Sequence, residues 1–449
     1  MLTTLALIAA LAQPSPAAKP KEGARAAESG TVKVVMGSPN PVPQAQGWKM
    51  LTGPDTTSQW RGYKQPSFPA KGWKSENGEL SIAKEGGGGD IITVDQFADF
   101  DLAFDFKLGP KANSGIMFRV AETDGPSYMT GPEYQLLEDA TYGAKPTDAH
   151  ACGALYDLYP PAEGKTMKPQ GEWNEGRIWI HNGVIQHWLN GKKIVEVHAF
   201  EDTGAATPEW AAKIAASKFK DAKGFGVLPK GFIAVQDHGD TELSLRNMRI
   251  RSLDTRANER ALYNGKDLTG WVAFVPDLID KKEDPAQVWS VQDGILVCRG
   301  NPIGYIRTKE KFTNYILRVE WRFNPVTKKA GNSGVLLRMV GEDKVWPKSV
   351  EAQLQSGSAG DFWNIDEVKM TVDPARTSGR NTKKTHGAEF PIGQWNEYEI
   401  IVNHSDVILN VNGEELNRAT NVEEVPGYIC LQSEGAEIHF RSVRITPLE

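Results

Sequence analysis

RIWIHNGVIQHWLNGKKIVEV, residues 177–197, is the stretch that decides the fold. It holds three apolar runs, separated by the dipeptides Asn182-Gly183 and Asn190-Gly191. Asn-Gly is the strongest short hairpin signal, because a type I′ turn needs a positive φ at both central residues. The stretch therefore predicts a three-stranded antiparallel meander.

The meander belongs to a longer sequence pattern that occurs twice in the chain. NSGIMFRV at 113–120 returns as NSGVLLRM at 332–339, and GEWNEGRIWI at 171–180 returns as GQWNEYEIIV at 393–402. GFIAVQDHG, which begins at Gly231, returns as GYICLQSEG. The order of the motifs is the same in both halves, which indicates a tandem duplication. We expect two domains, at about 45–254 and 258–449, that follow each other closely.

Each half is written as short strands. LAFDFKL (102–108), EYQLLE (133–138) and FIAVQ (232–236) are further strand-like runs, and a helical insertion at about 208–222 interrupts the first half. Many short strands with turn signals and little helix predict an all-β sandwich. The fold class expected is therefore all-β, with two tandem jelly-roll β-sandwich domains and one short helical insertion in the first. We expect each jelly roll to have one concave face.

Composition and charge narrow the possible partners. Of 449 residues 40% are apolar and 24% charged, and the formal net charge is −6 with both signs mixed along the chain. No basic face suited to phosphates is evident, so nucleic acid is not an expected partner. No segment after the N-terminus is apolar enough to be a membrane span. The sequence does not indicate an oligomeric state.

The N-terminal residues 1–44 predict a signal peptide and a disordered leader. An apolar run at 2–12 ends in Ala-Leu-Ala, which resembles a signal-peptidase site, although the usual basic start is missing. A disordered apolar start is the alternative. The expected location is secreted or periplasmic, in a bacterium.

The cysteines and the spacing of potential metal ligands do not establish a disulfide or a metal site. The three cysteines are Cys152, Cys298 and Cys430, and the last two fall in predicted strands where they could pair. The sequence does not decide this, and no Cys/His spacing predicts a zinc site. We expect no required cofactor. Carboxylates on a concave face could hold calcium, but no ligand spacing supports it.

Both halves carry Glu-x-Gln on a predicted strand, as Glu133/Gln135 and Glu351/Gln353. Side chains at i and i+2 share a face of a strand, so we expect an exposed polar sheet face in each domain. A retaining glycosidase needs two carboxyl groups about 5–5.5 Å apart. The first half offers Glu138 three residues after Gln135, but the second half has Ser there. Double displacement on this strand is therefore disfavoured.

The motifs, as an ordered set, resemble the 3-keto-disaccharide hydrolase family. In the first half these are GPEYQLLED (131–139), CGALYDLYPP (152–161), GEWN (171–174) and QDHG (236–239). The second half resembles a variant through motifs such as VEAQLQSGSAGDFW (350–363). The resemblance implies a concanavalin-like jelly roll and exported bacterial proteins that act on sugars oxidised at C3. A C3 ketone acidifies the C2 hydrogen, so a single base can start elimination of the C1 oxygen, and water can then add back.

Six residues are predicted to be catalytic, and they carry four kinds of side-chain group. Glu133 and Glu351 are the acid or base, Gln135 and Gln353 donate to a sugar or enolate oxygen, and Arg119 clamps an oxyanion. An ion pair of Arg119 with Glu133 or Glu138 is the alternative. His238 is the expected acid/base near neutral pH, although the second half has Glu434 in its place.

His150 is a second, weaker acid/base candidate. Six residues are predicted to bind substrate: Glu138, Tyr156, Asp157, Arg338, Asp361 and Trp363. Tyr156 with Asp157, and Trp363 with Asp361, each set an aromatic ring beside an acid, which suits a sugar. The first domain is the expected catalyst of glycosidic-bond hydrolysis in 3-keto-glycosides. A lectin-like module that binds carbohydrate without cleaving it, and a scaffold or adhesion repeat, remain the alternatives.

Overall fold

The structure is a computed structural model that describes residues 46–448, apart from 84–85, 240 and 255–257. The predicted signal peptide and leader lie outside the described residues. None of the described helices is long and apolar enough to cross a membrane.

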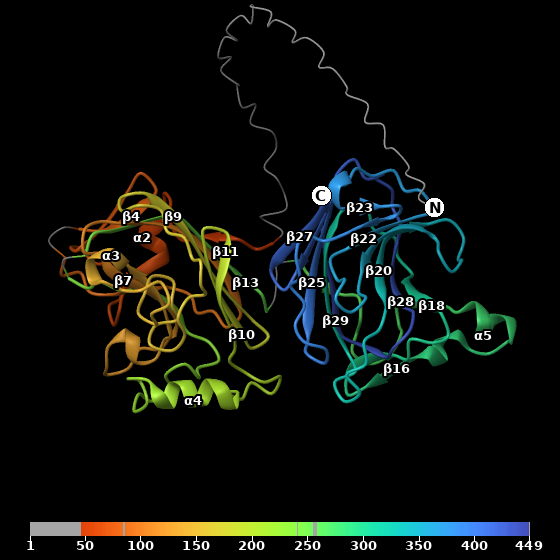
Figure 1. The fold of residues 1–449 in the computed structure, drawn as a ribbon, viewed down its shortest axis with the longest axis horizontal. Coiled ribbons are helices and arrows are strands. Elements are labelled where there is room, and N and C mark those ends of the chain that lie inside the picture. The colour runs from red at the N-terminus through yellow and green to blue at the C-terminus, as the bar shows by residue number, and fades with distance from the viewer. Residues whose placement is uncertain (1–45, 84–85, 240, 255–257, 449) are drawn as a thin grey trace, which may run out of the picture. The chain divides into compact units, whose positions relative to one another are not determined.

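The described part of the first half is a pair of antiparallel sheets. One has the order β11-β10-β9-β6-β13-β4-β3 with β1 beside β13, and the other has the order β2-β5-β12-β7-β8. Of these strands, β4, β7, β9, β10, β11 and β13 are labelled in Figure 1. The strands are β1 Lys49–Met50, β2 Trp60–Gly62, β3 Trp73–Glu76, β4 Glu79–Ile82, β5 Ile91–Thr93, β6 Phe100–Leu108, β7 Asn113–Val120, β8 Glu133–Leu137, β9 Trp173–His181, β10 Val184–Leu189, β11 Lys192–His198, β12 Phe232–Val235 and β13 Leu243–Ser252. The helices are short: α2 Thr56–Gln59, α3 Asp139–Tyr142, the 3-10 turn η1 Ser127–Met129 and α4 Pro208–Ala216. Helix α4 confirms the predicted insertion.

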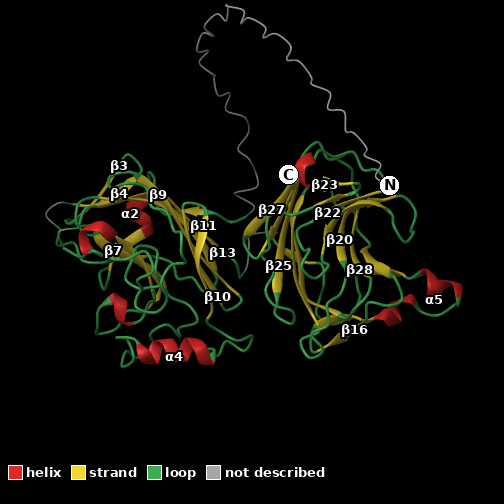
Figure 2. Ribbon diagram, viewed as in Figure 1, coloured by secondary structure: helices red, strands yellow, loops and turns green. Residues whose placement is uncertain are grey.

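The second half repeats this plan. Its sheets have the orders β16-β17-β29-β19-β25-β26-β27, with β14 beside β29, and β15-β18-β28-β20-β21-β22-β24-β23. The strands are β14 Arg260–Ala261, β15 Trp271–Phe274, β16 Trp289–Gln292, β17 Ile295–Cys298, β18 Gly304–Thr308, β19 Tyr315–Phe323, β20 Gly334–Val340, β21 Lys348–Gln353, β22 Phe362–Ile365, β23 Thr377–Ser378, β24 Asn381–Thr382, β25 Asn396–Asn403, β26 Asp406–Val411, β27 Glu414–Ala419, β28 Tyr428–Ser433 and β29 Ile438–Pro447. The helical pieces are α5 Pro276–Asp280, η2 Pro285–Val288 and η3 Pro374–Arg376. Strands dominate both halves (Figure 2), as the all-β fold class predicts.

A hydrophobic core lies between the two sheets of each half. In the first half it joins Phe104 of β6 to Tyr134 of β8, whose rings meet edge to face with centroids 5.5 Å apart. Leu136 of β8 is also fully buried in this core, as the period of two along a strand predicts. The second half encloses the equivalent core around residues such as Val335 and Ala352. The packing confirms the sandwich prediction.

The predicted meander is formed as β9, β10 and β11. Asn182 and Gly183 have φ values of 50° and 80°, and Asn190 and Gly191 have 49° and 77°. Both turns therefore have the two positive φ angles of a type I′ hairpin.

Each half has a β-bulge where an arginine takes a left-handed backbone conformation. Arg119 in β7 has φ 53° and Arg338 in β20 has φ 50°. From Met117 to Val120, three steps along β7 face two steps along β12, because these residues pair with Ala234 and Phe232. The extra residue interrupts the alternation of side chains, so each arginine points away from the face that its position in the sequence predicts.

The three cysteines are free and buried, so the possible Cys298–Cys430 disulfide is not formed. Cys298 packs in the core between the sheets, whereas Cys430 packs in a separate cluster with Tyr305 and Leu336. The two thiols thus belong to different faces of the second sandwich.

Candidate functional site

A pocket of about 980 Å³ opens over the five-stranded sheet of the first half. Strands β7 and β8 form its floor through Asn113, Glu133 and Gln135. The loop after α3 and the segment after α4 form its walls. Its other lining residues include Asp90, Tyr128, His150, Tyr156, Lys218, Gln236, Asp237 and His238.

Glu133 lies at the bottom of this pocket and is only 6% exposed. A Cβ atom on Gly115, in the neighbouring strand β7, would stand 1.8 Å from Glu133 Oε1. The carboxyl group therefore occupies the space above a glycine that has no side chain of its own. The second half repeats the arrangement, because a Cβ atom on Gly334 would stand 2.4 Å from Glu351 Oε1. This explains why the Asn-Ser-Gly motif precedes the Glu-x-Gln strand in both halves.

Burial raises the pKa of Glu133 to about 8; the positive charge of Lys218 opposes this and the negative charge of Asp90 adds to it. A carboxyl group of this kind exchanges protons close to neutral pH, as acid/base catalysis requires. The prediction of an exposed sheet face is wrong, since Glu133 and Gln135 are both buried. Loops and the α4 segment roof the sheet and turn the polar face into the floor of a pocket.

Gln135 is held by its neighbour on β7. Its Nε2 atom donates to Asn113 Oδ1 at 3.1 Å, and the side chain is 3% exposed. One amide hydrogen is thus used to fix the orientation of the side chain. The second remains to point into the pocket that the residue lines.

Asp90 is a pocket carboxylate that the repeat comparison did not single out. Ser127 Oγ donates to its Oδ2 atom, and the backbone N–H of Asp237 donates to its Oδ1 atom at 2.9 Å. Burial raises the pKa of Asp90. The only sequence signal was its place directly after four glycines and before a strand, and the second half has Tyr305 at the corresponding position of β18.

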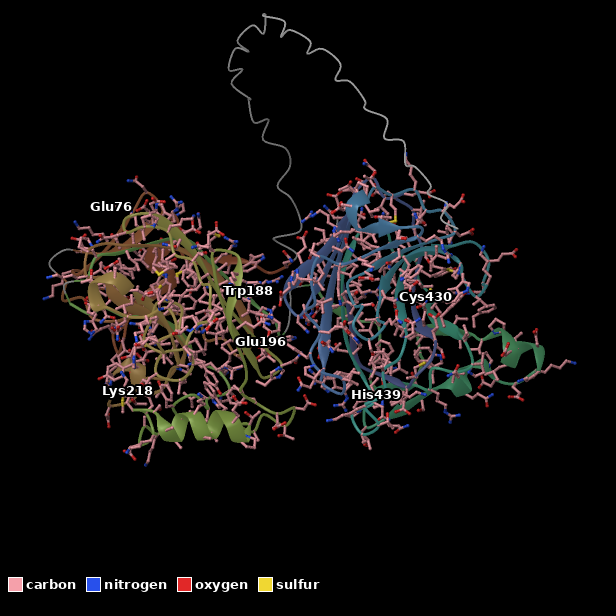
Figure 3. All side chains as sticks on the ribbon, in the orientation of Figure 1. Glu76, Trp188, Glu196, Lys218, Cys430 and His439 are labelled. Atoms are coloured by element: carbon pink, nitrogen blue, oxygen red, sulfur yellow. The ribbon has the colours of Figure 1, made fainter. Side chains whose placement is uncertain are left out.

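Lys218 is the other residue that was missed, and it comes from the insertion that the second half lacks. Its side chain lies beside α4 in Figure 3. The ammonium group donates to Tyr156 Oη at 3.2 Å and lies 4.2 Å from the centre of that ring. The lining of the pocket by Tyr156 agrees with its predicted place in the site. No comparison of the two halves could point to Lys218, because only one half has it.

Asp157 supports these groups instead of lining the pocket. Its Oδ2 atom accepts from the backbone N–H of Lys218 at 2.8 Å, and its Oδ1 atom lies 3.1 Å from His150 Nε2. The other ring nitrogen of His150 lies 3.0 Å from Asp148 Oδ1. His150 therefore faces the pocket between two carboxylates.

His238 lines the pocket from the loop after β12 and is exposed. The residue before it, Asp237, accepts hydrogen bonds at 3.0 Å from the backbone N–H groups of both Gly88 and Gly89. This ties the histidine loop to the glycine-rich loop that leads into Asp90. The imidazole is therefore placed at the pocket wall on a braced loop.

Two predicted residues of the first half lie elsewhere. Arg119, turned by its bulge, donates to Ala98 O and to Asp99 Oδ1 at 3.1 Å, so it is neither an oxyanion clamp nor a partner of Glu133. Glu138 caps helix α3, accepting from the backbone N–H of Thr141 at 2.8 Å, and does not line the pocket. Both serve the fold.

The second half keeps part of the site. Glu351 is 4% exposed and burial, with the nearby charge of Glu434, raises its pKa to about 8. Gln353 Oε1 instead accepts from the backbone N–H groups of residues 354 and 355 at 2.8 and 2.9 Å, which holds this amide against its own loop. Trp363 pairs across strands with Glu351.

Two substrate-binding predictions in this half meet protein partners. Arg338 donates to the backbone carbonyls of Thr313 and His404, at 2.9 and 2.7 Å, as its bulge dictates. Asp361 Oδ1 accepts from the backbone N–H of Lys384 at 2.9 Å. Arg338 therefore fixes loops, and Asp361 holds the segment that leads from β24.

Among the described residues, His181, Glu320 and Glu397 could geometrically gather around a metal ion. The ring nitrogens of His181 lie 3.1 Å from Asp99 Oδ2 and 3.1 Å from Glu397 Oε2. Burial opposes protonation, but Glu397 and Asp99 outweigh it and raise the pKa of His181 to about 10. In this structure the imidazole of His181 lies between two carboxylates, and the group forms an ion-pair cluster.

Comparison with known proteins agrees with the internal repeat. The chain matches the family described as 3-keto-alpha-glucoside-1,2-lyase-like domain twice, over residues 47–251 and 258–446. It is 33% identical over 242 residues to a 3-keto-disaccharide hydrolase of Bacteroides thetaiotaomicron. The aligned region covers 47% of this chain and 80% of that relative. Two crystal structures from Parabacteroides distasonis, described as glycosyl hydrolases, are 28% and 29% identical. They cover 48% and 46% of this chain and 98% and 99% of their own, with TM-scores of 0.41 and 0.35. The chain belongs to the family of 3-keto-alpha-glucoside-1,2-lyase-like domains and carries two copies of that domain in tandem.

Proposed function

We propose that the first half cleaves the glycosidic bond of 3-keto-glycosides, such as 3-keto-disaccharides, by elimination followed by hydration. The observation that carries the proposal is the buried Glu133 at the bottom of the pocket, whose pKa is raised to about 8 by burial. Such a carboxylate is a stronger base than an ordinary glutamate, and it faces Lys218, a cation that can stabilise developing negative charge. The family and the Bacteroides relative support the substrate class.

The first step is removal of the C2 proton by the Glu133 carboxylate. The electron pair of the C2–H bond moves into the enolate, and the charge collects on the C3 oxygen. Lys218 and the free amide hydrogen of Gln135 both line the pocket and are suited to donate to that oxygen.

The second step is departure of the C1 oxygen. The enolate re-forms the C3 carbonyl, a C1=C2 double bond forms, and the C1–O bond breaks. His238 in its imidazolium form gives its proton to the leaving oxygen. The products are an alcohol and a 2-hydroxy enone sugar, and addition of water to the enone completes a net hydrolysis.

Asp90 is not the second carboxylate of a double-displacement pair in this proposal. Its two oxygens already accept from Ser127 and from the backbone of Asp237. It acts as a fixed negative charge that helps keep the pKa of Glu133 high.

The test compares a 3-keto-disaccharide with its unoxidised parent, using the full chain in D2O. We expect turnover of the keto sugar alone, with solvent deuterium at C2 of the 3-keto monosaccharide, and loss of about 100-fold or more of the rate in Glu133→Gln. Glu122→Gln, at a carboxylate paired with Arg61 outside the pocket, is the matched control. Turnover without deuterium at C2, or binding without turnover, would overturn the proposal. The N-terminal motif makes export to the periplasm or medium part of the proposal, which fractionation of the native host would test.

A further inference from the structure

Lys218 stands on an insertion of the first half, so its ammonium group reaches the pocket only where that insertion is held in place. The residue follows helix α4 and is exposed. A lysine side chain is a flexible four-carbon stem, and fixing its charge at one point costs conformational entropy. The proposed reaction nevertheless needs this cation at one place, near Glu133 and the C3 oxygen. The residue is held by contacts at both of its ends.

The ammonium end of Lys218 is held by Tyr156. Its Nζ atom donates to Tyr156 Oη at 3.2 Å and lies 4.2 Å from the centre of the ring. The backbone N–H of Tyr156 in turn donates to the backbone carbonyl of Glu133 at 3.0 Å. The ring that binds the cation is therefore tied to β8, the strand that carries the proposed base.

The backbone end of Lys218 is held by Asp157, whose side chain is 20% exposed. The Oδ2 atom of Asp157 accepts from the backbone N–H of Lys218 at 2.8 Å, and its Oδ1 atom lies 3.1 Å from His150 Nε2. The other ring nitrogen of His150 is fixed by Asp148, and its ring meets the Tyr156 ring edge to face, with centroids 4.9 Å apart. Asp157 also has a φ of 61°, a left-handed conformation that aspartate adopts more readily than most residues with a side chain. One carboxylate thus joins the loop after β8 to the insertion.

We propose that Asp157 is a positioning residue for the reaction: by accepting the backbone N–H of Lys218, it sets where the ammonium group stands relative to Glu133. His150 holds the Asp157 carboxylate from the opposite side. The inference rests on the proposed function for the role of Glu133 as the base, and it extends that function to a residue outside the lining of the pocket.

The charge of Asp157 and its positioning of Lys218 act on Glu133 with opposite signs. A neighbouring negative charge disfavours a carboxylate, so loss of the Asp157 charge alone would lower the pKa of Glu133 or leave it unchanged. The positive charge of Lys218 favours the carboxylate, so its displacement from the pocket would raise that pKa. Asp90 and His238, which also line the pocket, are unaltered in the variants used. The direction of the shift therefore separates the two effects.

The test measures the pKa of Glu133 in the full chain in two ways. One is the pH dependence of kcat/KM for a 3-keto-disaccharide. The other is a substrate-free titration of the Glu133 carboxyl carbon by 13C NMR, with the signal assigned by its loss in Glu133→Gln. Asp157→Gly removes the carboxylate and suits a φ of 61° without strain. We expect it to raise both values by about 0.5 pH unit or more, in the same direction as Lys218→Met.

Two further variants show whether Asp157 acts through Lys218. Asp157→Asn loses the charge but keeps an oxygen that can accept the Lys218 N–H, so it should return the pKa to the wild-type value or slightly below. The double variant Lys218→Met with Asp157→Gly should not raise the pKa above that of Lys218→Met alone, because no ammonium group is left to position. Asp221→Asn, at an exposed carboxylate of the same insertion, is the matched control and should leave the pKa unchanged.

An unchanged or lowered pKa in Asp157→Gly would overturn the inference, and so would a further rise in the double variant. A failure of the proposed function gives a different result. In that case the keto-disaccharide is not consumed by the wild-type chain, while the substrate-free titration still decides whether Asp157 positions Lys218.

Discussion

Gly115→Ala is expected to disable the first-half site without touching any reacting group. The added Cβ would lie 1.8 Å from Glu133 Oε1, whereas an ordinary contact begins near 3.4 Å. The carboxylate must therefore move by the difference, 3.4 − 1.8, or about 1.6 Å. Displacement of a catalytic group by about 1 Å can cost about 100-fold in rate, so we expect kcat/KM for a 3-keto-disaccharide to fall by at least about that factor.

The assay pairs this variant with Gly334→Ala, which creates the equivalent clash with Glu351 in the second half. Both changes overpack a buried site and should lower the free energy of unfolding by about 1–3 kcal/mol. Only Gly115→Ala should slow consumption of the keto-disaccharide. Equal rates in the two variants at equal loss of Tm would refute the assignment of Glu133 as the reacting base.

Three further outcomes follow from the charges around Glu133. With removal of the C2 proton by the Glu133 carboxylate as the slow step, and with the pKa of Glu133 raised to about 8 by burial, kcat/KM for the keto-disaccharide should rise about tenfold per pH unit below pH 8 and level off above it, which a pH–rate profile measures. Lys218→Met removes the charge that lowers the pKa of Glu133, so the inflection should move to higher pH, and Lys218→Arg should restore it; an unmoved inflection would contradict this role. The raised folded pKa means that the folded state binds more protons than the unfolded state between pH 4.5 and about 8, so this group reduces stability as the pH rises through that window. Glu133→Gln should therefore raise Tm at pH 8.5 but not at pH 4. The expected gain in unfolding free energy at pH 8.5 is up to about 3–5 kcal/mol, and a gain that is independent of pH would contradict the assignment.

The fold could be predicted from the sequence because the patterns that specify it are local. The Asn-Gly turns encode the meander, and alternation along β8 places Leu136 in the core and Glu133 on the opposite face. The floor of the site follows from the same rule. The tandem repeat adds a second, independent copy of each signal.

The errors arise where long-range structure overrides the local rule. Arg119 and Arg338 stand at matching places of the two repeats and were predicted to act in the site, but a bulge at each residue turns its side chain elsewhere. Lys218 reaches the pocket from an insertion, so only the folded chain brings it to Tyr156. Glu138 carries the spacing of a known catalytic motif, yet the chain turns directly after β8 and uses it as a helix cap.

The contact between Glu133 and Gly115 also constrains how β7 and β8 can pair. Gly115 pairs with Gln135 and Met117 pairs with Glu133, so the glutamate side chain leans along the sheet to stand over the glycine. Asn113 and Met117, two places on either side of Gly115, both carry side chains. A two-residue slip would keep the apolar side chains facing the core, so burial alone would tolerate it. The slipped pairing would, however, place a side chain under the glutamate. The glycine that makes room for the reacting group thus also favours the native register, because a slip of two residues puts Asn113 or Met117 in its place opposite Gln135.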